Sequence, residues 1–232
     1  MPGGLGLPSE IADLPTTAEG YWGVLIMDAV LETYGPTDRA QWPVADSSVD
    51  NLLSLSGRLS ARELGTAMAV LTSYNKSDDE ATALNPEDST GQVSHLLTAE
   101  SVIAPGGVRI RDTSTGATAA PGCCFGVESW RDWLHLMDGE EPWLGHSPTP
   151  GIEHNGATVR LWPDGEHRTG LPIELPLAQL PELMGSVQDQ LVGFLASVGE
   201  WASQYAPSLA DALVAKLDED FVIRGPLREG QG

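Results

Sequence analysis

Hydrophobic residues recur every three or four positions near the start of the chain, which predicts an amphipathic helix. The pair Thr16 and Glu19 has capping-box spacing, and Gly35-Pro36 marks the end of the segment. The apolar positions between these signals are Tyr21, Trp22, Leu25, Ile26, Ala29 and Val30. We therefore expect a first helix between the two signals.

Two more helices are expected before residue 76. One runs from about Ser48 to Ser56, and the other opens with a capping box formed by Ser60 and Glu63. The apolar face of the latter helix is formed by Leu64, Ala67, Met68, Leu71 and Tyr74. The first ninety residues thus have the pattern of a helical subregion.

The periodic pattern is lost over residues 76–91, which are rich in acidic and small polar residues and predict an exposed acidic loop. Residues 101–112 then alternate around Pro105-Gly106-Gly107 and predict a strand, or two strands joined by a turn. Residues 113–121 have the composition of a loop. Beyond them, Trp130, Trp133, Leu134 and Met137 share the spacing of a short amphipathic helix that stops at Gly139.

The dipeptide Asn155-Gly156 lies between two alternating segments and predicts a β-hairpin. A two-residue loop would pair His154 with Ala157 and Glu153 with Thr158. Hydrophobic alternation places one set of side chains on a common face: Ile152, His154, Val159 and Leu161. The opposite face carries Glu153, Thr158, Arg160 and Trp162. A further strand is expected at Ile173 and Leu175.

The C-terminal third carries the longest helical pattern in the chain. Its apolar face is formed by Leu180, Leu183, Met184, Val187, Leu191, Phe194, Leu195, Val198, Trp201 and Tyr205. Pro181 fits the first turn of this helix, and Pro207-Ser208 is expected to cap a last helix that carries Leu209, Leu213, Val214 and Leu217.

Together these patterns predict an α+β fold: an N-terminal helical part, then a small, mostly antiparallel sheet packed by a long C-terminal helix hairpin. We expect residues 1–91, with the acidic loop 76–91, to form the helical subregion. Residues 92–232 then form the α+β subregion, and the two together are expected to make one continuous globular domain.

Composition narrows the functional classes. The chain has 33 acidic and 12 basic residues, a net charge of −21, and both halves are similarly acidic, with 16 acidic and 6 basic residues in 1–116 and 17 and 6 in 117–232. Direct nucleic-acid binding is therefore not expected, since it needs clustered lysine and arginine, whereas a basic protein partner would be attracted.

The N-terminus lacks signal-peptide features and no apolar run is long enough for a membrane span, which predicts a cytoplasmic protein. Two lysines beside ten arginines are typical of a GC-rich bacterial genome.

Rare, reactive side chains are concentrated between residues 121 and 167, which hold both cysteines, four of five histidines and four of seven tryptophans. Cys123 and Cys124 are adjacent and precede a predicted helix, whose N-terminal dipole would favour a thiolate. His135, His146 or His154 would then serve as a base. The alternative is that the two cysteines are buried packing residues, the more usual environment for cysteine.

No metal or cofactor is expected from the spacing. A zinc site would need the cysteines and histidines of this block to converge, and neither a CxxC pair nor an HExxH motif is present. The chain also lacks P-loop, GxGxxG, GxSxG and kinase signatures. These absences favour a binding protein over an enzyme.

The proline-rich segment 142–150 contains Trp143 and His146, which we predict to contact a partner, together with Asp164 and Glu166 in the turn that follows the hairpin. The alternative is a structural crossover with a core tryptophan. The favoured hypothesis is a non-enzymatic, acidic cytoplasmic protein that neutralises or regulates a basic protein partner, as an immunity or antitoxin-type inhibitor does. The other hypotheses are a small-molecule or thiol-dependent enzyme, with Cys123, Cys124, His135 and His154 as catalytic candidates, and a structural subunit of a larger assembly.

Overall fold

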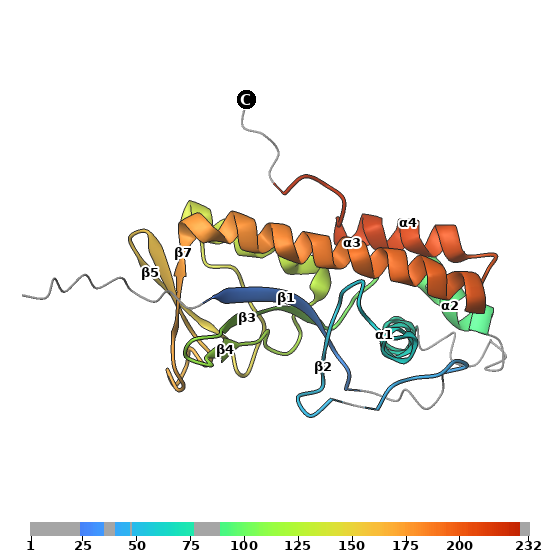
Figure 1. The fold of residues 1–232 in the computed structure, drawn as a ribbon, viewed down its shortest axis with the longest axis horizontal. Helices are drawn as coiled ribbons and strands as arrows, with labels where there is room; N and C mark the ends of the chain where they lie inside the picture. The colour runs from blue at the N-terminus through green and yellow to red at the C-terminus, as the bar shows by residue number, and fades with distance from the viewer. Residues whose placement is uncertain (1–23, 35–39, 47, 77–88, 228–232) are drawn as a thin grey trace, which may run out of the picture.

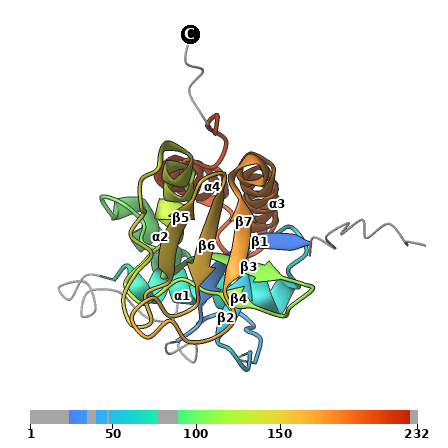
Figure 2. The same ribbon diagram turned by 90° about the vertical axis from the view of Figure 1, so that its left-hand side faces the viewer.

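A computed structural model describes residues 24–34, 40–46, 48–76 and 89–227, and its strands form two antiparallel sheets (Figure 1). Sheet one has the order β2-β1-β3-β4, from β1 (Leu25–Glu32), β2 (Leu52–Ser54), β3 (Gly106–Asp112) and β4 (Thr118–Ala119). Sheet two has the order β5-β6-β7, from β5 (Gly151–Asn155), β6 (Thr158–Trp162) and β7 (Ile173–Pro176). Figure 2 shows sheet two face-on, with sheet one behind it.

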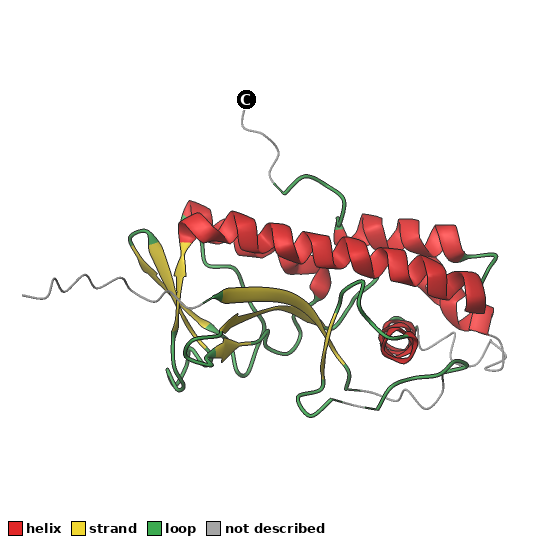
Figure 3. Cartoon of the chain, in the orientation of Figure 1, coloured by secondary structure: helices red, strands yellow, loops and turns green. Residues whose placement is uncertain are grey.

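The longest helix runs along one face of sheet one, as Figure 3 shows in red above yellow. The helical segments are α1 (Ala61–Tyr74), α2 (Ser89–Thr98), η1 (Val127–Asp138), η2 (Leu177–Gln179), α3 (Leu180–Tyr205) and α4 (Ala210–Phe221), of which η1 and η2 are 3₁₀ helices. Helix α3 packs against β1 of sheet one, and α4 packs against α3, α2 and η1. The fold is therefore α+β, as predicted. Among the described residues, no helix is both long and apolar enough to cross a membrane.

The predicted first helix is wrong where the structure describes it, because residues 25–32 form strand β1. β1 pairs with β2 on one side and β3 on the other, and Met27 to Leu31 are buried on both faces. A strand buried on both faces loses its alternation, so an apolar run of this kind cannot be told from a buried helix by its period. Thr16, Glu19, Tyr21 and Trp22 lie outside the described residues.

The helix predicted over 48–56 is also wrong. Leu52–Ser54 forms the edge strand β2, and Asn51 before it has a φ of 53° in the left-handed region. The carboxylate of Asp50 accepts a hydrogen bond from the backbone N of Leu52, which fixes a turn in place of a helical start.

Helix α1 confirms the third prediction. Ser60 accepts a hydrogen bond from the backbone N of Glu63, and the Glu63 carboxylate accepts one from the backbone N of Ser60, which is the reciprocal capping box. The predicted apolar face is buried except for Tyr74 at the exposed end of the helix.

Helix α2 is not predicted by the sequence pattern. Its first three residues fall in the segment 76–91 that is expected to be a loop, and residues 77–88 of that segment lie outside the described residues.

The remaining elements follow the sequence closely. β3 is the strand predicted within 101–112, although two residues of the expected loop 113–121 pair with it as β4. The 3₁₀ helix η1 buries Trp130, Trp133 and Leu134, and it ends at Gly139, whose φ of 80° suits a residue without a Cβ. Helices α3 and α4 occupy the predicted segments, but α4 begins at Ala210 with no side-chain cap rather than at Pro207-Ser208.

The hairpin is confirmed with a shifted register. His154 pairs with Val159 and Asn155 with Thr158, so the turn is Gly156-Ala157 rather than Asn155-Gly156. The shift displaces the pairing by two residues, which leaves every side chain on its predicted face. Val159 and Leu161 accordingly lie in the core with Ile173 and Leu175 of β7.

Candidate functional site

Two loop segments run side by side near one end of sheet one and bring rare side chains together. The backbone N of Gly122 donates to the carbonyl of Leu144 at 2.8 Å. Cys123 and His146 exchange two backbone hydrogen bonds, of 3.1 and 2.9 Å. The first segment follows β4 and the second follows η1, so residues more than twenty positions apart in the sequence are held in fixed register.

Glycine is required for this close approach. A Cβ at Gly122 would overlap the backbone carbonyl oxygen of His146, and a Cβ at Gly145 would overlap that of Gly122. Gly145 also has a φ of 98°, in the left-handed region that residues with a Cβ rarely adopt. The two segments can therefore lie this close only because both positions lack a side chain.

The first segment is also tied to sheet one. The backbone N of Gly106 donates to the carbonyl of Phe125 at 3.0 Å, and the backbone N of Glu32 donates to the carbonyl of Pro105 at 2.8 Å. Phe125 is buried, with 4% of its surface exposed. The first contact fixes the cysteine segment to the start of β3, and the second joins the residue before β3 to the end of β1.

The side chains of Cys123, Cys124 and His146 form a surface cluster, which we call the thiol–imidazole cluster. The two Sγ atoms lie 3.8 Å apart, and one donor atom from each of the three residues lies within 4.8 Å of the others. Both thiols are free and exposed, and Cys124 has a φ of 64°. The spacing of cysteines and histidines along the chain gives no indication of this cluster, because spacing carries no information about a backbone pairing between two loops more than twenty residues apart.

The electrostatics of the cluster oppose a free nucleophile. The side-chain hydrogen bond with Cys124 is the largest cause that raises the pKa of the Cys123 thiol, followed by desolvation and by the charges of Cys124 and Glu32. A backbone hydrogen bond with His146 acts in the opposite direction. Since the thiolate is the reactive form, a raised pKa makes Cys123 less nucleophilic at neutral pH.

The two other catalytic candidates lie outside this cluster. His135 is exposed on η1, and His154 is on β5. The Nε2 atom of His154 is buried and has no hydrogen-bond partner among the described residues. Of the predicted histidines, the structure therefore places only His146 beside the cysteines.

Trp143 stands next to the thiol–imidazole cluster and is 53% exposed. Its ring meets the imidazole of His146 edge-on at 5.2 Å and the ring of Phe125 at 6.0 Å. Phe125 is buried, so Trp143 is anchored at its base while much of its surface faces solvent. Trp143 and His146, which we predict to contact a partner, thus lie side by side at the surface, and the partner contact itself stays a prediction.

Trp143 also lines a groove of about 460 Å³ between the proline-rich segment and sheet two, which we call the tryptophan groove. Its walls include Glu141, Pro142, Trp143, Trp162, Glu166 and Arg168. The guanidinium of Arg168 lies 5.8 Å from the centre of the Trp162 ring and pairs with Glu153 at 3.7 Å. The groove therefore already accommodates a guanidinium against an aromatic face.

Asp164 stabilises the turn that borders the groove. Its carboxylate accepts hydrogen bonds of 3.0 Å from the backbone N atoms of both Glu166 and His167. The backbone hydrogen bond from His167 is the largest cause that lowers the pKa of Asp164. Asp164 therefore holds the backbone of Glu166 and His167 in the turn, and of the two predicted acidic contacts only Glu166 lines the groove.

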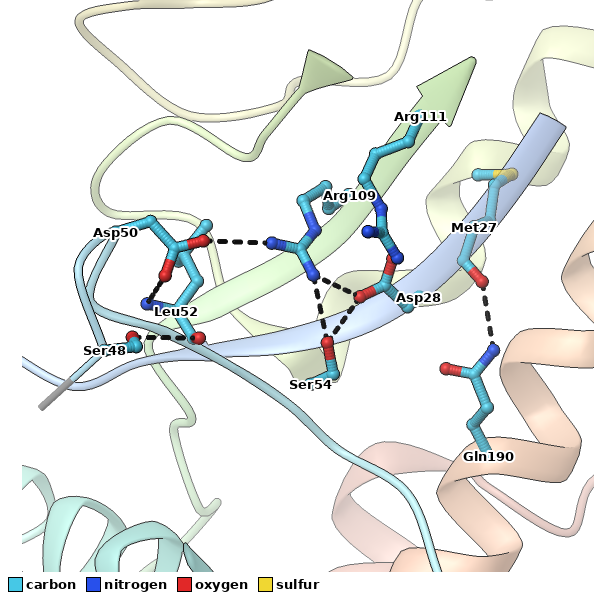
Figure 4. Close-up of polar contacts among 9 residues, drawn as sticks. All are labelled: Met27, Asp28, Ser48, Asp50, Leu52, Ser54, Arg109, Arg111 and Gln190. Carbon is cyan, nitrogen blue, oxygen red and sulfur yellow. Dashed lines mark hydrogen bonds and ion pairs between the residues drawn. The ribbon is translucent and has the colours of Figure 1, made fainter. Parts of the chain in front are cut away.

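A second polar cluster, absent from the sequence predictions, lies in sheet one (Figure 4). Asp28 is 4% exposed, and its carboxylate pairs with Arg109 at 2.6 Å and Arg111 at 3.3 Å. The hydroxyl of Ser54 donates to Asp28 at 2.6 Å, and Arg109 also reaches Asp50 at 3.2 Å. We call Asp28, Ser54, Arg109, Arg111 and Asp50 the sheet-one charge network.

A signal for this network is present in the sequence. The alternation Val108-Arg109-Ile110-Arg111 places both arginines on one face of a strand. Asp28 lies opposite Arg109 in the register, but the interpretation of residues 25–32 as a helix concealed that pairing. The network borders a cleft of about 590 Å³ that Ser186, Asp189 and Gln190 of α3 also line.

No family model, curated protein or solved structure matches this chain. The functional assignment therefore depends on the geometry and charge of the described residues.

Proposed function

We propose that the chain is an acidic binding protein that neutralises or regulates a basic protein partner, in the manner of an immunity or antitoxin-type inhibitor. The observation that carries this proposal is the tryptophan groove, which combines an exposed tryptophan, Trp143, a half-buried tryptophan, Trp162, and two exposed carboxylates on a chain of net charge −21. An arginine or lysine side chain of a partner would gain both ring contacts and ion pairs there.

The groove has the composition of an interface anchor. Trp143 is half-exposed yet held at its base by Phe125, so it presents a large rigid surface at low cost in conformational entropy. Arg168 demonstrates the chemistry within the chain, because its guanidinium lies over Trp162 in the same groove. A partner guanidinium would add to or displace this contact.

The overall charge supports rapid association with such a partner. An excess of 21 negative charges, distributed over both halves of the chain, creates a field that steers a basic protein toward the surface. This attraction is screened over roughly 10 Å at 0.1 M salt. The groove would then supply the short-range selection that charge alone lacks.

We also propose that the protein works in a reducing compartment such as the cytoplasm. Two free, exposed thiols whose sulfur atoms lie 3.8 Å apart would be readily oxidised in a secretory compartment. A thiol-dependent enzyme is less well supported, because the pKa of Cys123 is raised and neither His135 nor His154 belongs to the cluster.

Titration with a dye-labelled peptide of alternating arginine and glycine, followed by fluorescence anisotropy, tests the proposal. The double variant Glu141→Gln/Glu166→Gln should weaken binding about tenfold, which corresponds to about 1.4 kcal/mol. The matched control is Glu182→Gln/Glu200→Gln, which removes the same charge from exposed positions of α3 and should weaken binding less than about twofold. Equal losses in both double variants, or no binding at low salt, would reject the groove as the recognition site.

A further inference from the structure

We propose that the thiol–imidazole cluster is a metal site in which Cys123, Cys124 and His146 bind one Zn²⁺ ion. Within the part of the chain that the structure describes, these residues form the one group of three cysteine, histidine or acidic side chains with donor atoms close enough for a shared ion. Two thiolates and one imidazole are a donor set that zinc prefers.

The sulfur geometry agrees with this assignment. Zn–S bonds of about 2.3 Å at a tetrahedral angle place two sulfur atoms about 3.8 Å apart. The Sγ atoms of Cys123 and Cys124 lie 3.8 Å apart. Adjacent cysteines therefore reach the required separation here, and the left-handed backbone of Cys124, with a φ of 64°, accompanies this arrangement.

The third ligand comes from a separate segment that is already in place. His146 is held by its two backbone hydrogen bonds to Cys123, and its imidazole rests against the ring of Trp143. The donor atoms lie within 4.8 Å of one another, and a small rotation of the His146 side chain would bring the imidazole nitrogen within bonding distance of an ion held by the two sulfur atoms. The backbone bridge thus organises the site before the metal arrives.

Three protein ligands leave a fourth tetrahedral position. A water molecule or a small ligand would complete the coordination, and the site is exposed enough to admit either. On binding, each thiol releases its proton to solvent and the imidazole coordinates in its neutral form.

The site can be tested on the full chain with its thiols reduced. Titration with Zn²⁺ against a chromogenic chelator should show one equivalent bound. Titration with Co²⁺ in place of Zn²⁺ should produce the absorption of thiolate-to-cobalt charge transfer. The variants Cys124→Ser and His146→Ala should each weaken Zn²⁺ binding by about 100-fold or more, since loss of an outer-sphere partner alone costs 10- to 100-fold.

His135→Ala is the matched control, because it removes an exposed histidine outside the cluster and should leave Zn²⁺ affinity unchanged. Both cysteines and His146 are exposed, and circular dichroism of each variant in a metal chelator checks that the fold is retained. The proposal is overturned if the reduced protein binds no Zn²⁺, if Cys124→Ser binds it normally, or if His135→Ala weakens it as much as His146→Ala does.

The zinc site and the peptide-binding function are independent, and the experiments separate them. Anisotropy titrations are run in a chelator and again with Zn²⁺, so loss of one activity leaves the other measurable. Trp143, which contacts His146 and lines the groove, is left unchanged in both sets of variants.

Discussion

The sheet-one charge network and the thiol–imidazole cluster hold polar side chains together in opposite ways. In the network, ion pairs hold the side chains in place: Asp28 is almost fully buried, and its carboxylate forms hydrogen-bonded ion pairs with two arginines. In the cluster, the backbone does the holding, through a glycine-dependent bridge, and the side chains remain exposed. Exposed polar side chains on a rigid backbone can bind a ligand, whereas buried charged side chains that pair with one another contribute to the fold instead.

The largest effect is expected from breaking the network. Asp28→Ala would leave Arg109, whose side chain is only 11% exposed, without its main partner and should destabilise the protein by about 3 kcal/mol. Glu200→Ala, on the exposed face of α3, removes the same charge and should change stability by less than about 0.5 kcal/mol. Urea unfolding measures both. A similar small change in the two variants would show that the network contributes little.

A smaller effect is expected from breaking the bridge. Gly122→Ala places a methyl group against the backbone of His146 and should cost about 1–3 kcal/mol, with weaker Zn²⁺ binding. Gly185→Ala is the control in α3, where an added Cβ meets no atom within 4 Å. It should stabilise the protein by about 0.5–1 kcal/mol, because alanine is the better helix former. Stability changes of the same sign in both variants would contradict the role assigned to the bridge.

The smallest expected effect is on the reactivity of the Cys123 thiol, which is measured as its rate of alkylation. Because the pKa of Cys123 is raised, chiefly by Cys124, alkylation by iodoacetamide at pH 6.5 should be slow despite full exposure, and it should accelerate as the pH rises. Cys124→Ala removes the side-chain hydrogen bond that is the largest cause of the raised pKa, and it should speed the labelling of Cys123 at neutral pH. The rates are measured by mass spectrometry in a chelator. Rapid labelling of the parent protein at pH 6.5 would instead favour a catalytic thiol.

The sequence predicted elements well where one face of an element meets solvent. The C-terminal helices, η1 and the hairpin all show a regular alternation, because water on one side and core on the other select residues by position. Prediction failed at β1, where both faces are buried and the alternation disappears, and at the edge strand β2, whose three residues are too few to show a period. It also missed α2, whose buried residues include the polar Gln92 and His95.

The candidate sites show the same contrast between what a local pattern predicts and what depends on contacts between distant segments. The sequence drew attention to the side chains of both candidate surface sites between 121 and 167, including Cys123, Cys124, Trp143 and His146, because their types are rare and chemically distinctive. It could not group them, since the contact between residues 122–123 and 144–146 depends on two glycines and on loop paths that have no periodic signal. Arg109 and Asp28 were missed because their pairing follows from a strand register that was not predicted.

The sequence alone therefore determined the α+β class, the strongly acidic composition, the long C-terminal helix pair and the concentration of cysteine, histidine and tryptophan between residues 121 and 167. Each of these depends on local periodicity or composition, which a single chain displays directly. The tertiary structure decided which cysteines and histidines lie close together, which tryptophans line a groove and which charged side chains form buried ion pairs. Those outcomes depend on contacts between distant segments, and such contacts are specified by packing and backbone register rather than by spacing along the chain.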